Sequence, residues 1–324
     1  MQLIEAVPNV SEGRDLEVVR QIAEEAVMTN TAKVIHMDSN PDANRTVFTI
    51  AGEPIEVVKA CLELITSATK YIDMHLHKGM HPRLGATDVC PLVPLRDISL
   101  FETAVYAKEL AWNVAEELKI PVYLYETNSS DPNRKNLSFI RKGEYENLAE
   151  KLQTLPPDFG PHEMSPFIEK VGATVIGTRN LLIAFNMSLD TRDMEVAKQI
   201  ASHLREKNGG LPGVKTMAWY MLGYGCTQVS CNLTDYHKTN LVTLFETCKK
   251  EAAKFDVTIT GSEIIGLVPE EAMLQAGKHY TPYESNKDAL IASAADRLLL
   301  NRIHRFDAHE KILENALRNY QLIR

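Results

Sequence analysis

Residues 180–206, NLLIAFNMSLDTRDMEVAKQIASHLRE, decide the fold that we expect for this chain. Asn180 to Leu189 has the pattern of a strand, and Asp193 to Glu206 has the spacing of a helix. Asp190 or Thr191 is available as the N-cap of that helix. The elements expected next are two strands, a helix and a strand, at 214–222, 227–233, 241–255 and 257–268. This β-α-β-β-α-β order is the ferredoxin-like, or split β-α-β, motif.

The first half of the chain repeats this order between Leu3 and Leu95, with an extra helix and strand after it. The elements expected there are 3–7, 15–28, 34–37, 46–51, 55–71, 87–95, 100–118 and 122–125. Two copies of one unit predict an α+β protein with two ferredoxin-like subdomains packed around a central cleft. Clefts between subdomains are favoured ligand sites.

The segment from Glu126 to Gly172 breaks this pattern, because it is rich in turn-forming residues and has few apolar runs. Long segments of this kind are usually linkers or functional loops, and we expect this one to be both. The expected boundaries are 1–178 for the N-terminal subdomain, including a connector at 126–178, and 179–324 for the C-terminal subdomain. The latter is expected to end in a helical tail, with helices at 289–301 and 308–322.

Composition limits the classes of function. Apolar residues make up 44% of the 324 residues and charged residues 24%, as in ordinary globular proteins. The net charge of −8 argues against a general nucleic-acid binder. There is no basic N-terminal region of a secretory signal and no apolar run of about 18 residues that could span a membrane. The 5 irregularly spaced cysteines indicate reduced thiols. We therefore expect a cytoplasmic globular protein.

The densest polar segment is HLHKGMHPRLGATD at 75–88, between a predicted helix and a predicted strand. One interpretation makes His81 a general acid–base, since Pro82 restricts its backbone and Arg83 can grip a carboxylate with a bidentate fork. The positive charge of Arg83 should also lower the imidazole pKa and leave a neutral base. Lys78 would bind anions.

A metal site is the alternative interpretation of the same segment. Its ligands would be His75, His77, His81 and Asp88. This spacing matches no closed structural site, and Lys78 and Arg83 place positive charge where the cation would lie. We therefore expect no metal, and a merely solvated turn is the remaining alternative.

Two further segments are candidates. In DSNPDANR at 38–45, Asp38 could pair with a cationic amidine and Arg45 with a carboxylate, or the segment could be a simple turn. In VPNVSEGR at 7–14, backbone N–H groups could hold an anion, or Ser11 could act only as an N-cap.

Ordered motifs run along essentially the whole chain: VPNVSEG at 7–13, NRTV at 44–47, HKGMHPRLGA at 77–86, PVYLY at 121–125, DFGP at 158–161, GATV at 172–175, GS at 261–262 and GLVP at 266–269. In these motifs the chain resembles the glutamate formimidoyltransferase family. The resemblance implies two ferredoxin-like subdomains, a homodimer, and transfer of a formimidoyl group from formiminoglutamate to N5 of tetrahydrofolate in histidine degradation. Tetrahydrofolate would be a co-substrate, without a metal.

The resemblance also implies roles for single residues. His81 corresponds to the family's catalytic histidine, and Asp38 to an acidic residue of its active site. Lys78, Arg83 or Arg45 would bind carboxylates of glutamate or of the folate tail. The folate contacts implied are Gly160, Pro161, Phe167 and Gly172. In animals the domain is fused to a cyclodeaminase; this chain resembles the stand-alone form, so we expect no cyclodeaminase activity.

Three other functions stay open at this point. The first is transfer of a formyl group from N-formylglutamate, which the same fold could accept. The second is a folate-binding protein without catalytic activity, against which the presence of His81 and Arg83 argues. The third and most distant is a metallohydrolase.

Overall fold

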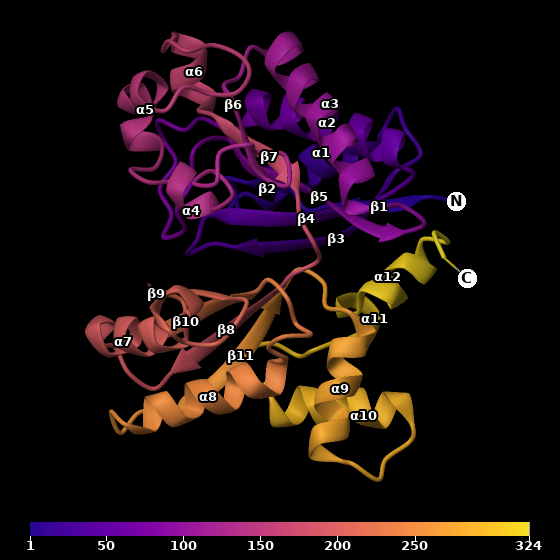
Figure 1. The fold of residues 1–324 in the computed structure, drawn as a ribbon, viewed down its shortest axis with the longest axis vertical. Helices are drawn as coiled ribbons and strands as arrows, with labels where there is room; N and C mark the ends of the chain where they lie inside the picture. Colours follow the sequence, from indigo (N-terminus) through magenta and orange to yellow (C-terminus); the bar gives the residue numbers. More distant parts are fainter. Residues whose placement is uncertain (324) are drawn as a thin grey trace. The chain divides into compact units, whose positions relative to one another are not determined.

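The computed structural model describes residues 1–323 and has the α+β fold expected from the sequence (Figure 1). The chain divides after Asn180 into two compact units, each with its own sheet and its own apolar core. Within the described residues, no helix combines the length and the apolar character needed to cross a bilayer.

The second unit has the ferredoxin-like arrangement. Its elements are β8 (Ile183–Leu189), α7 (Met194–Leu204), β9 (Val214–Met221), β10 (Cys226–Leu233), α8 (Leu241–Ala253) and β11 (Ile259–Ile265). The strands form an antiparallel sheet in the order β11-β8-β10-β9. The N-cap of α7 is Asp193, whose carboxylate accepts hydrogen bonds from the N–H groups of Glu195 and Val196. The prediction of Asp190 or Thr191 as this cap was therefore wrong.

The first unit begins with the same order of elements. They are β1 (Leu3–Ala6), β2 (Asn9–Val10), α1 (Leu16–Val27), β3 (Lys33–Asn40), β4 (Arg45–Gly52), α2 (Pro54–Tyr71), β5 (Thr87–Arg96), α3 (Leu100–Leu118), β6 (Val122–Glu126) and β7 (Thr174–Thr178). The strand expected at 3–7 is β1, and the short strand β2 after it was not predicted. Pro8, which has no N–H for the ladder, lies between the two. Both strands pair with β4 and β5.

The connector is part of the first unit's fold, and its interpretation as a linker was wrong. Its last segment forms β7, which lies between β5 and β6 and is parallel to both. Its other elements are α4 (Leu137–Ile140), a 3₁₀ turn (Tyr145–Asn147), α5 (Leu148–Thr154) and α6 (Pro166–Val171). They bury Ile140, Leu152 and Ile168 in a core with β6 and β7, separate from the core that contains α1 to α3.

The chain ends in helices, as expected. They are α9 (Glu270–Tyr280), α10 (Lys287–Arg297), α11 (Ala308–Lys311) and α12 (Leu313–Asn319). We did not predict α9. The single helix expected at 308–322 is two helices, because Ile312 is extended and bridges to Val268.

Two glycines with positive φ, but with ψ of −147° at Gly172 and 13° at Gly209, give a test of backbone conformation and packing. Gly172 ends α6 with φ +74°, and a Cβ atom there would lie 2.5 Å from the Cα of Gly85. Gly209 has φ +86°, but a Cβ atom there would meet nothing within 4 Å. We expect Gly209→Ala to lower the free energy of unfolding by about 1 kcal/mol through φ strain, and Gly172→Ala by about 3 kcal/mol through strain and overlap. Urea denaturation measures both, and equal losses would contradict the packing at Gly172.

Candidate active site

The three polar segments, kept apart in the sequence, meet in the first unit through Asn44. This residue has a left-handed backbone with φ 47°. Its Oδ1 accepts a hydrogen bond from the N–H of Gly13 at 3.0 Å, and its Nδ2 donates to the carbonyl oxygen of Lys78 at 3.2 Å. Its own carbonyl oxygen accepts from Nε2 of His77 at 2.8 Å. One turn residue thus joins the segments 7–14, 38–45 and 75–88.

Ser11 makes a second link between these segments. Its Oγ donates to the carbonyl oxygen of Gly85 at 2.7 Å, and its N–H donates to that of Ala86 at 2.8 Å. The N-cap of α1 is instead Asp15, whose carboxylate accepts from two backbone N–H groups of the first turn. Ser11 therefore holds the histidine loop to β2, and its prediction as an N-cap was wrong.

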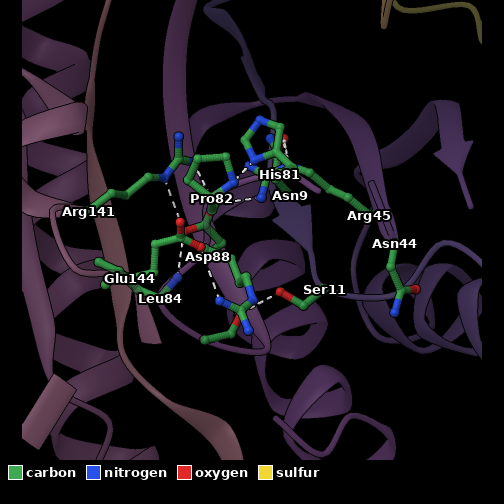
Figure 2. A network of polar contacts seen from close by, with 12 residues as sticks. Asn9, Ser11, Asn44, Arg45, His81, Pro82, Leu84, Asp88, Arg141 and Glu144 are labelled. Carbon is green, nitrogen blue, oxygen red and sulfur yellow. Dashed lines mark hydrogen bonds and ion pairs between the residues drawn. The ribbon is translucent and has the colours of Figure 1, made fainter. Parts of the chain in front are cut away.

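His81 lies half-buried in this loop, and its tautomer follows from one contact (Figure 2). Nδ1 lies 2.7 Å from the carbonyl oxygen of Pro82. A carbonyl oxygen only accepts hydrogen bonds, so Nδ1 carries the proton and the neutral ring has its lone pair on Nε2. That nitrogen is the basic atom of the site.

Asp88, on β5, is completely buried and is held by two arginines. Nη1 of Arg45 donates to its Oδ2 at 2.6 Å, and Arg141 donates to both carboxylate oxygens through Nε and Nη2. The N–H of Leu84 donates to Oδ1 at 3.0 Å. Burial raises the pKa of this carboxyl, but Arg141 and Arg45 outweigh it and hold the pKa at about 2. Burial likewise lowers the pKa of Arg45 to about 10.

The pKa of His81 lies well below its usual value of 6.5. Burial is the largest cause, and the charges of Arg45 and Arg141 add to it, while Asp88 and the Pro82 carbonyl act in the opposite direction. The pKa of His81 thus lies in the direction expected from the sequence, while its role as a base stays a prediction. The expected source of the positive charge was wrong, because the two arginines on Asp88 supply it rather than Arg83.

Arg83 has another partner. Its buried guanidinium forks onto Glu146, with Nη1 at 2.7 Å and Nη2 at 2.6 Å, and Nη1 also reaches Glu144 at 3.1 Å. Nε donates to Nδ1 of His77 at 3.2 Å. The hydrogen bond to Glu146 is the largest cause that raises the pKa of Arg83. Arg83 thus fastens the connector to the histidine loop, and its fork is occupied by the chain's own carboxylates.

The four residues weighed as metal ligands serve separate hydrogen-bond networks. Both ring nitrogens of His77 are used, by Asn44 and Arg83, and Nδ1 of the exposed His75 contacts Asp73 at 2.7 Å. The carboxylate of Asp88 is held by arginines. In the described part of the chain, no group of three or more His, Cys, Asp or Glu side chains is placed to hold a metal ion.

Asp38 lies in β3 and Lys78 lies in the histidine loop. Asp38 is half-buried inside β3, opposite Val47 of β4, because β3 is longer than the strand 34–37 that we expected. Lys78 is exposed and lines an open depression of about 480 Å³. Its other lining residues are Gly79, Arg83, Gly143, Glu144 and Glu146.

Of the four residues implied for folate, Phe167 lies in α6, Gly172 follows its last residue, and Gly160 and Pro161 precede it in the chain. Pro161 and Phe167 line a second depression, of about 570 Å³, together with Leu118, Lys119, Glu163, Met164, Ser165 and Ile168. Gly160 and Gly172 both have positive φ and both pack against backbone. The backbone conformation and close packing at Gly160 and Gly172 therefore favour glycine at both positions, independently of any contact with folate.

Sequence reasoning missed Arg141 and weighed Asp88 only as a metal ligand. A signal existed for Asp88, because a carboxylate in an apolar strand that becomes buried needs cationic partners. No signal pointed to Arg141, which lies 53 residues away in the connector.

The fold and the site define a class: an α+β protein in which a neutral histidine lies beside a buried Arg–Asp–Arg cluster, an arrangement suited to acid–base chemistry on an anionic substrate. Comparison with known proteins then gives the family. Residues 3–179 match the model of the formiminotransferase domain, N-terminal subdomain, and residues 184–318 match that of the formiminotransferase domain. The chain belongs to the formiminotransferase family.

Similar proteins include fused and shorter relatives. The chain is 41% identical to formimidoyltransferase-cyclodeaminase of Mus musculus over 97% of its own length, and it spans only 59% of that protein. It is 42% identical to glutamate formimidoyltransferase of Thermoplasma acidophilum, over 86% of this chain and 92% of the relative. The protein of the same name from Streptococcus pyogenes serotype M1 is 35% identical, over 98% of this chain and 99% of the relative.

Proposed function

We propose that this protein transfers the formimidoyl group of N-formimidoyl-L-glutamate to N5 of tetrahydrofolate and releases L-glutamate, as a step of histidine degradation. The observation that supports this most directly is His81, a neutral base with its lone pair on Nε2, beside the positively charged cluster on Asp88. Membership of the formiminotransferase family supports the choice of group.

In the proposed reaction, N5 of tetrahydrofolate attacks the formimidoyl carbon and gives a tetrahedral intermediate. Nε2 of His81 accepts the proton that N5 loses, and then returns a proton to the glutamate nitrogen as the bond between carbon and that nitrogen breaks. One well-placed acid–base group of this kind contributes about 10²- to 10⁴-fold in rate. Holding the two substrates together supplies much of the remainder.

The other predicted residues take supporting roles in this proposal. Asp38 offsets the charge of the formamidinium, and Lys78 attracts carboxylates of the substrates. Arg83 positions the connector. The depression at Pro161 and Phe167 receives part of the folate. The protein works as a homodimer in the cytoplasm, with tetrahydrofolate as co-substrate and without a metal.

The test is an absorbance assay with tetrahydrofolate and either formiminoglutamate or N-formylglutamate. We expect product from the formimino donor. Product only from the formyl donor would replace the proposal by formyl transfer. Folate binding without product from either donor would leave a binding protein and remove the catalytic role of His81.

The pH dependence follows from the lowered pKa of His81. Because the folded-state pKa lies below 6.5, the imidazole is already neutral at pH 6.5, and it gains a proton only as pH falls through the lowered pKa. We expect kcat/KM to stay flat from neutral pH down past 6.5 and to fall at lower pH. A pH–rate profile measures this, and an inflection at or above 6.5 would contradict the electrostatics of the site.

A further inference from the structure

The cluster on Asp88 has an excess of positive charge. Arg45 and Arg141 both donate to the same oxygen, Oδ2, and the carboxylate balances only one of them. Their side chains are 7% and 14% exposed, so water screens this charge poorly. An uncompensated positive charge that is mostly buried is destabilising, and a bound anion would relieve it.

Each of the two arginines also has one terminal nitrogen that donates to no residue of the described chain. Arg141 uses Nε and Nη2 on Asp88, and no residue among 1–323 accepts from its Nη1. Arg45 uses Nε on Asn9 and Nη1 on Asp88, and its Nη2 likewise has no acceptor in the described chain. Asp88 fixes both guanidinium groups, and Asn9 fixes one of them a second time. The site therefore offers rigid donors from two different elements, β4 and the connector.

Figure 2 shows the side chains of Arg45 and Arg141 around Asp88, close to His81. Their charges accordingly lower the pKa of His81. In the proposed reaction His81 returns a proton to the α-nitrogen of glutamate. The α-carboxylate is bonded to the same carbon atom as that nitrogen, whereas the γ-carboxylate lies three carbon atoms further along. The anion that can reach cations beside His81 is thus the α-carboxylate.

We propose that Arg45 and Arg141, fixed by Asp88, bind the α-carboxylate of the glutamate donor. This subsite rests on the proposed formimidoyl transfer and adds Arg141, from the connector, to the substrate-binding residues. Binding of the carboxylate also cancels the excess charge beside His81. The ring is then free of that repulsion when it accepts the proton from N5.

The experiment compares two donors on two enzymes. Formiminoglutamate has both carboxylates, whereas 4-(formimidoylamino)butanoate lacks only the α-carboxylate. We expect the wild-type enzyme to prefer the complete donor by about 10- to 100-fold in kcat/KM, the range for a charge-assisted hydrogen bond. In Arg141→Gln this preference should fall by about that factor, while KM for tetrahydrofolate stays the same. Arg141→Lys, which keeps a charge on Asp88, should retain part of the preference.

A matched control is Arg134→Gln. Arg134 lies in the same connector, is 12% exposed and pairs with Asp158 at 2.6 Å. Its loss should leave the preference between donors unchanged. If Arg141→Gln slows both donors equally, Arg141 has only a structural role and the proposal is wrong. If the preference lost is instead for the γ-carboxylate, tested with 2-(formimidoylamino)butanoate, the assignment to the α-carboxylate is wrong. No transfer by the wild-type enzyme would refute the proposed function itself.

Discussion

His81→Ala should lower kcat by about 10²- to 10⁴-fold and leave the melting temperature nearly unchanged. The loss follows because Nε2 is the atom that we propose to accept the proton from N5. Folding should tolerate the change, because Nδ1 donates a local hydrogen bond to the carbonyl of the next residue, Pro82, and the ring is half-buried at the surface of the loop. Steady-state kinetics with the formimino donor and a thermal melt of the same preparation measure the two effects.

The matched control for this variant is His75→Ala. His75 lies in the same loop, is exposed, and contacts Asp73 at the surface. Its replacement should leave kcat within about a factor of two, as for a surface residue outside a catalytic site. Near-normal turnover of His81→Ala would remove His81 from the mechanism, and an equal loss in both variants would indicate damage to the loop.

Asp88→Asn should lower the free energy of unfolding by about 3–5 kcal/mol and remove most activity. The asparagine cannot balance two arginines, and its own NH₂ group would face their N–H donors. Because the pKa of Asp88 is lowered from 3.8 to about 2, its contribution is complete above pH 3.8 and is lost as pH falls through about 2. Urea denaturation should therefore show a large difference between variant and wild type near neutral pH, and a smaller one in acid.

Asp73→Asn provides the comparison, since Asp73 is a half-exposed carboxylate that contacts His75. We expect it to cost less than about 1 kcal/mol, the usual range for surface ion pairs. An Asp88→Asn protein as stable as the wild type at neutral pH would show that the two arginines do not depend on the carboxylate.

The sequence predicted those parts of the fold that depend on local patterns. The order of strands and helices in both units was visible because each element is a continuous apolar run or a periodic helix face. The strand β7 was missed within the connector because its five residues, TVIGT, are short and pair only with β5 and β6. Parallel strands are joined by long crossover connections, so no hairpin turn in the sequence indicates that they pair.

The candidate site was also predicted only in part. The loop 75–88 was found from its composition, and His81 was selected within it. We predicted wrongly that Arg83 supplies the positive charge that lowers the pKa of His81. The prediction assumed that two residues close together in the sequence also interact in space. Its fork holds Glu146.

The sequence by itself determined the α+β class, the paired β-α-β-β-α-β units and the histidine loop, since these depend on residues close together in the chain. Only the tertiary structure decided which cations surround His81. Arg45 comes from β4 and Arg141 from the connector, and both pair with Asp88 of β5. A carboxylate buried in a strand is stable only when cationic side chains pair with it, and these come from distant parts of the sequence. Electrostatic partners are chosen by distance in space, which a single sequence does not show.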